Sequence, residues 1–131
     1  MKNPLENYRK TDLMTANREV ILLMMYSGAI RFLKQGIEAG EAEDYVLMNR
    51  MATKTQEVVN ELRSTLNFEV GGDIAKNLES LYAFITERLL KGCLDRQVKP
   101  LTEALGIIQT LNEAWEQAIA SLKKKRIQTE K

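Results

Sequence analysis

Residues 20–26 read VILLMMY, a run of seven apolar side chains in a chain that is 28% charged. Consecutive residues of a helix are turned by about 100°, and a helix that packs on one core needs an apolar stripe only slightly wider than that. Seven apolar residues in a row therefore cannot all face the same core. A helix with this run has two apolar surfaces, and the second one needs cover of its own.

The rest of the chain also reads as helix. It has only two prolines, and no stretch alternates with the period of a strand. Capping residues, glycines and Pro100 predict four helices. They are expected near residues 15–39, 44–68, 73–95 and 98–122. Because the loops are short, the sequence predicts an all-α, antiparallel up-down-up-down four-helix bundle.

Two flanking segments complete the predicted organisation. Residues 1–14 lack a helical stripe but carry apolar side chains, so we interpret them as an N-terminal cap segment folded back on the first helix. The bundle itself spans residues 15–122, and residues 123–131 form a short basic C-terminal tail. With Asp73 as its cap, the third helix begins after the Gly71–Gly72 break.

Apolar spacing assigns one inward stripe to each of the last three helices. Their core positions include Ile74, Leu81 and Leu122. The first helix differs, because it holds more apolar residues than its stripe needs. Its stripe is already complete with Leu22, Met25, Tyr26, Ala29, Leu33 and Ile37.

The surplus residues of the first helix lie on two flanks. Val20, Leu23 and Met24 share the flank that Ser27 marks as solvent-facing, while Ile21 and Phe32 widen the arc on the other side. Contiguous exposed apolar patches usually mark contact surfaces. We therefore predict that the first of these flanks binds a partner. Off their own stripes lie Phe84 and Ile107.

Composition excludes several classes of function. With 19 basic and 18 acidic residues the net charge is +1, which provides no electrostatic footprint for nucleic acid or an anionic membrane. The chain has no histidine, so most zinc sites and the commonest general base are missing. We expect no enzyme, no catalytic residue, no metal and no cofactor.

The same features point to the cytoplasm. The opening MKNPLENYRK has no apolar signal-peptide core, and the longest apolar run is far short of the ~20 residues that cross a bilayer. One cysteine, Cys93, agrees with a reducing compartment.

An ordered set of short motifs resembles the flagellin-specific export chaperone family, FliS. The set covers nearly the whole chain: Tyr8, Thr15–Arg18 (TANR), Leu23–Leu33 (LMMYSGAIRFL), Val58–Leu62 (VVNEL), Leu66, Asn77–Leu78, Leu81–Tyr82, Arg88–Leu89 and Ala114–Trp115.

The resemblance implies a cytoplasmic chaperone that binds the disordered C-terminal segment of flagellin. Such a chaperone prevents premature polymerisation and delivers the subunit to the gate of the flagellar type III export apparatus. The family's N-terminal segment, here around Tyr8 to Met14, is implied to cap a groove until the client displaces it. The predicted partner-binding residues are Tyr8, Leu13, Met14, Thr15, Ala16, Val20, Leu23, Met24, Ser27, Phe84 and Ile107.

One alternative stays open from the residues alone. A structural or adaptor bundle without a client would bury the surplus patch in a homo-oligomer. For the chaperone itself, a weak homodimer is a further partner that the patch permits.

Overall fold

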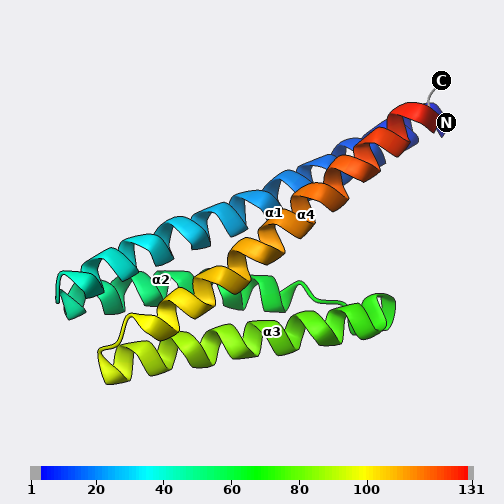
Figure 1. Ribbon diagram of the computed structural model, residues 1–131. Helices are drawn as coiled ribbons and strands as arrows, with labels where there is room; N and C mark the ends of the chain where they lie inside the picture. The colour runs from blue at the N-terminus through cyan, green and yellow to red at the C-terminus, as the bar shows by residue number, and fades with distance from the viewer. Residues whose placement is uncertain (1–3, 130–131) are drawn as a thin grey trace.

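The described chain folds into four helices that run alternately in opposite directions (Figure 1). The computed structural model describes the backbone of residues 4–129 and the side chains of residues 17–128. The helices are α1 (Pro4–Glu41), α2 (Tyr45–Ser64), α3 (Phe68–Asp95) and α4 (Lys99–Thr129). Each helix packs on the next one along the chain, and α4 packs back on α1. The predicted all-α, four-helix fold is confirmed.

Local chemistry sets most helix boundaries where the sequence predicts them. Asp44 caps α2 by accepting a hydrogen bond from the backbone N–H of Leu47 at 3.1 Å. Arg96 follows the end of α3 with a left-handed backbone, φ 51°. Pro100 lies in the first turn of α4, where a backbone N–H would have no partner within the helix, so the N–H that proline lacks is not needed.

The core lies where the inward stripes of all four helices meet. Thirteen buried apolar residues form it, with partly buried residues packed around them. The largest side chains that are fully buried are Tyr26, Leu33, Met48, Ile85, Leu101, Ile108 and Val59. All seven belong to helices that the sequence predicts, and Tyr26 comes from the VILLMMY run.

The outermost helix limits differ from the prediction. We expected the first helix to begin near Thr15, but the backbone is already helical from Pro4, in line with the rest of α1. Residues 4–14 contain no helix breaker after Pro4, so the helix simply continues through them. Likewise α4 runs on to Thr129 and takes up most of the predicted basic tail, because lysine and arginine are good helix formers.

The start of α3 is a partial correction. Asp73 was expected to cap the helix, whereas the N-cap is Asn67, whose side chain accepts hydrogen bonds from the N–H groups of Glu69 and Val70, both at 3.1 Å. The predicted break is present as a kink at Gly72, where φ is 51° and ψ is −124°. Only glycine adopts this conformation easily, so the first turn of α3 stands at an angle to the rest.

Unequal helix lengths leave one end of the bundle open. At 1.5 Å per residue, the 38 residues of α1 span about 57 Å and the 20 residues of α2 about 30 Å. In Figure 1, α1 and α4 run on side by side past the end of α2, and the ion pair between Arg126 and Glu19 joins them there. The end where α2 stops and α3 begins is called the open end below.

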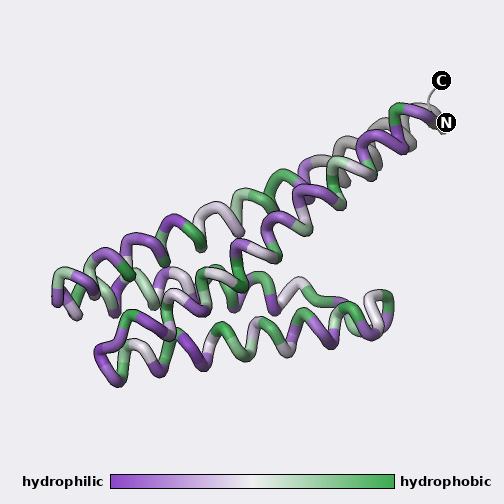
Figure 2. Tube along the Cα trace, viewed as in Figure 1, coloured by the Kyte–Doolittle hydropathy of each residue, from purple (hydrophilic) through white to green (hydrophobic). Residues whose placement is uncertain are grey.

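Two predicted core positions, Ile74 and Leu122, are exposed for this reason. Ile74 is 70% exposed and Leu122 is 49% exposed, because they lie where a neighbouring helix has already ended or turned away. A third predicted core position, Leu81, is 36% exposed on the surface between α3 and α4, where both helices are present. The spacing of Ile74 and Leu122 is that of core residues, but the helix that would cover them at the open end is absent. Figure 2 shows hydrophobic segments, in green, at this end of α2 and α3.

One stretch of the described residues, Asn17–Glu41, is long and apolar enough to span a membrane by length and composition. This is a weak indication, because a core helix of a soluble bundle passes the same test. Tyr26, Ala29 and Leu33 of this stretch are fully buried against the other helices. The stretch therefore contributes to the core of the bundle.

The close approach of α3 to the start of α4 generates a stability prediction. A Cβ added at Gly92 would lie 2.2 Å from Cδ1 of Leu101 and 2.9 Å from the carbonyl oxygen of Gln97. We expect Gly92→Ala to lower the free energy of unfolding by about 1–3 kcal/mol through overpacking.

Gly106→Ala is the matched control, because a Cβ there meets nothing within 4 Å. It should raise the free energy of unfolding by about 0.4–1 kcal/mol, as glycine-to-alanine changes do in helices. Urea unfolding followed by far-ultraviolet circular dichroism measures both. Equal effects of the two substitutions would contradict the packing at Gly92.

Candidate binding surface

The open end holds a cleft to which all four helices contribute. Its volume is about 320 Å³. The lining is almost entirely apolar and, apart from a tyrosine, carries no ionisable side chain; it consists of Leu22, Leu62, Thr65, Leu66, Asn67, Val70, Gly71, Ile74, Ala75, Leu78, Tyr82 and Trp115. A cleft of this kind accepts uncharged, apolar side chains.

The cleft continues into two grooves along α1. The first, of about 440 Å³, shares Leu22 and Thr65 with the cleft and adds Ile21 and Met25. The second lies between α1 and α2, has a volume of about 390 Å³, shares Met25 with the first and reaches Phe32. The three hollows together are called the apolar track. From Leu22 to Phe32 it follows α1 for about 15 Å.

Charged side chains border the track away from the cleft. Lys54 places its Nζ 5.6 Å from the centre of the Phe32 ring, and Glu57 and Glu61 line the same groove. Arg18 lines the middle groove. The cleft itself is therefore neutral, while the two grooves are edged by both signs of charge, which is a pattern that orients an amphipathic partner.

The predicted partner-binding residues fall on several different surfaces. Tyr8, Leu13, Met14, Thr15 and Ala16 lie outside the residues whose side chains are described.

On the described part of α1, Met24 is 66% exposed, Val20 and Ser27 are also exposed, and Leu23 is half-buried. Phe84 and Ile107 meet in a separate groove of about 590 Å³ between α3 and α4. The structure thus brings Phe84 and Ile107 together but does not join them to the α1 flank.

The apolar track lies on the other flank of α1, the one that Ile21 and Phe32 widen. Ile21 is 56% exposed and lines the track together with Phe32. Sequence reasoning also missed Val70 and Ile74, which were assigned to a loop and to the core. Val70 and Ile74 lie on either side of the Gly-Gly break, and neighbouring helices do not cover a helix that bends there along its whole length. This position next to the break is the sequence signal that could have identified them.

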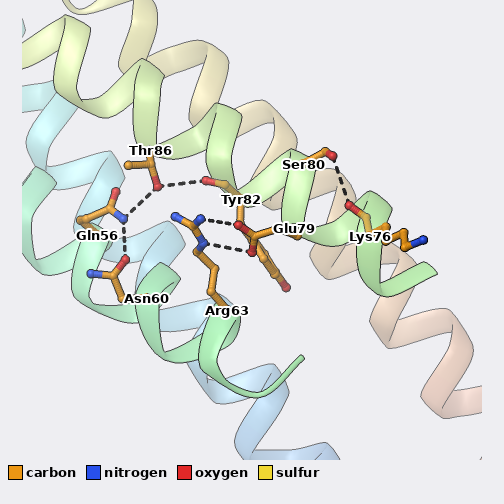
Figure 3. Close-up of polar contacts among 8 residues, drawn as sticks. All are labelled: Gln56, Asn60, Arg63, Lys76, Glu79, Ser80, Tyr82 and Thr86. Carbon is orange, nitrogen blue, oxygen red and sulfur yellow. Dashed lines mark hydrogen bonds and ion pairs between the residues drawn. The ribbon is translucent and has the colours of Figure 1, made fainter. Parts of the chain in front are cut away.

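Polar contacts, rather than apolar packing alone, join α2 to α3 beside the cleft (Figure 3). Gln56 donates from Nε2 to Oγ1 of Thr86 at 2.9 Å. Nearer the open end, Arg63 donates from Nε to Oε2 of Glu79 at 3.1 Å, and its second nitrogen binds the other carboxylate oxygen. These contacts are partly exposed, so they add little to the free energy of unfolding. Their main effect is to fix the spacing between α2 and α3.

A hydrogen-bonded triad lies at the base of the cleft, and two of its members, Tyr82 and Trp115, are among the lining residues. The hydroxyl groups of Tyr26 and Tyr82 hydrogen-bond to each other, and Trp115 donates from Nε1 to the Tyr26 oxygen at 3.2 Å. Burial raises the pKa of Tyr26, and it raises the pKa of Tyr82 far above the usual tyrosine range. Both phenols therefore keep their protons at neutral pH.

Within residues 17–128 there is no group of three or more acidic or cysteine side chains that could hold a metal ion. Burial raises the pKa of the Cys93 thiol, so it is protonated at neutral pH.

The raised pKa values of the tyrosine pair generate a prediction about pH. A folded-state pKa above the ordinary value of about 10 contributes stability that is fully present below pH 10 and is lost as the pH rises above it. We expect the free energy of unfolding to fall above pH 10, with a smaller fall for the Tyr26→Phe/Tyr82→Phe variant. Urea unfolding at several pH values measures this. An equal fall in the free energy of unfolding of both proteins above pH 10 would contradict it.

Comparisons with known proteins agree with one another. The family model described as "Flagellar protein FliS" matches residues 1–122. The "Flagellar secretion chaperone FliS" of Bacillus subtilis (strain 168) is 28% identical over 126 residues, which cover 96% of this chain and 93% of the relative. The protein of the same name from Vibrio cholerae serotype O1 is 31% identical over 121 residues, covering 89% of each chain.

A solved structure shows the same fold. A crystal structure described as a "flagellar chaperone from bacteria" superposes with a TM-score of 0.77 at 20% identity, covering 89% of this chain and 95% of that one. The family consists of chaperones and not of enzymes. The chain therefore belongs to the FliS family of flagellar secretion chaperones.

Proposed function

We propose that this chain binds the disordered C-terminal segment of flagellin in the cytoplasm, prevents its premature polymerisation and presents it to the flagellar export gate. Membership of the FliS family supports a flagellar export chaperone. The observation that carries the finer proposal is the apolar track, which continues from the four-helix cleft along α1 to Phe32. The bound flagellin segment is called the guest below.

Energetics favour an occupant of the track. An exposed side chain such as Ile21, Val70 or Ile74 forgoes roughly 1.5–3 kcal/mol relative to full burial. A folded bundle has no use for this surface in its own core. A disordered guest loses about 2–5 kcal/mol or more to ordering when it binds, so it needs contacts spread along a track rather than one pocket.

The shape and charge of the track fit an amphipathic helix or a mixed helical and extended segment. Such a segment lays apolar side chains into a groove at helical spacing. Its neutral end would enter the cleft, and its charged flank would lie beside Lys54, Glu57 and Glu61. While these apolar side chains are held against the chaperone, they are not free to pack into a filament.

Substitutions at two positions on α1 distinguish binding at the track from binding at the flank that the sequence predicts. Ile21 lines the track and Met24 does not, and both are exposed, so an aspartate at either should leave the fold intact. We expect Ile21→Asp to weaken binding of a flagellin C-terminal peptide at least tenfold, because it replaces an apolar contact in the groove with a charged carboxylate. Isothermal titration calorimetry gives the affinities, and thermal melting checks the fold.

Met24→Asp is the matched variant and tests the partner-binding residues Val20, Leu23 and Met24. Loss of binding only in Met24→Asp would move the guest to that flank. Normal binding by both variants would refute an α1 site altogether.

The N-terminal cap remains part of the proposal. The backbone of residues 4–14 is in line with α1, so capping requires this segment to leave the helix and fold back toward the track. Deletion of residues 1–14 should then tighten guest binding several-fold, because the competitor is gone. Calorimetry and light scattering test this, and unchanged affinity with an unchanged oligomeric state would rule the cap out.

A further inference from the structure

The three hydrogen-bonded side chains at the base of the cleft carry one more polar hydrogen than their two hydrogen bonds use. Trp115 donates its indole N–H to the oxygen of Tyr26, and the Tyr26 and Tyr82 hydroxyls share one hydrogen bond. The three side chains bring three protons, one from the indole and two from the phenols. The two hydrogen bonds use two of these protons, and no acceptor among the described residues takes the third.

The position of the two tyrosines decides where the unused proton points. Both tyrosines are buried, Tyr26 at 0% and Tyr82 at 2% exposure, and of the two only Tyr82 is among the residues that line the cleft. If Tyr26 donates to Tyr82, the unused proton belongs to the side chain that a ligand seated in the cleft would contact. The opposite direction would trap the Tyr26 proton in the core, where an unpaired donor is costly.

The surroundings define the acceptor that this donor can take. Apart from Tyr82, the cleft lining contains no ionisable side chain, so a carboxylate bound there would be desolvated without a cation beside it. A neutral carbonyl oxygen meets the requirement. The last backbone carbonyls of a helix have no partner within the helix, so the C-terminal turn of a guest helix offers such an oxygen.

We propose that Tyr82 is a specificity-determining residue that donates a hydrogen bond to a neutral carbonyl oxygen of the guest, at the end of a guest helix seated in the cleft. This inference rests on the proposed function and adds a polar requirement to it. Apolar packing in the cleft alone would accept any hydrophobic segment. The single donor selects segments that bring a carbonyl to the right depth and leaves the others with an unsatisfied hydroxyl.

The test compares two tyrosine-to-phenylalanine variants with the wild-type protein. The probe is a synthetic peptide of the flagellin C-terminal segment, titrated by calorimetry. Tyr82→Phe should weaken binding about tenfold, because the guest carbonyl is left without its donor. Tyr45→Phe is the control: Tyr45 begins α2 at the opposite end of the bundle, with the guanidinium of Arg96 5.3 Å from its ring centre, and its variant should bind like the wild type.

A spectroscopic readout on the wild-type chain covers the case in which Tyr82→Phe does not fold. With tyrosine labelled with ¹³C at Cζ, the Tyr82 resonance should shift when the peptide is added, and the Tyr45 resonance should not. Equal affinities of folded Tyr82→Phe and wild type, or an unmoved Tyr82 resonance in the saturated complex, would overturn the inference alone. Failure of the wild-type protein to bind the peptide would overturn the proposed function, and this inference with it.

Discussion

The structure depends on a mismatch of length between helices that must pack together. A four-helix bundle closes only where four helices are present, and α2 is little more than half as long as α1. Beyond Ser64, α1 and α4 continue side by side while the chain turns back through α3 (Figure 1). The interior is therefore open at this end, and the cleft, the track and the exposed residues Val70 and Ile74 all follow from it.

The polar triad explains how such an opening is compatible with a defined core. An apolar floor would let the helices slide or collapse into the vacant space, because apolar packing has little direction. The hydrogen bonds among Tyr26, Tyr82 and Trp115 join α1, α3 and α4 in one arrangement. The contacts of Gln56 and Arg63 do the same for α2 and α3. The cleft is thus held in shape by directional contacts.

Helical periodicity could predict the fold but not the shape of the surface. Caps and breakers such as Asp44 and Pro100 act locally, so they mark helix ends in the sequence alone. The burial of Ile74 depends on whether another helix reaches it, which the spacing of its own helix does not encode. For the same reason, the sequence reveals that α1 has more apolar residues than its core stripe needs, but it does not reveal which flank lines a groove. Ile21 and Met24 are both apolar and exposed, and they differ in the residues that lie beside them in the fold.

Trp115 has a consequence for any study of this protein. It is the only tryptophan in the chain and it lines the cleft, with its indole N–H bound to Tyr26. Intrinsic tryptophan fluorescence therefore comes from one known place. Because the emission wavelength of an indole depends on the polarity around it, the fluorescence of Trp115 reports whether water or a ligand occupies the cleft. No added label is needed.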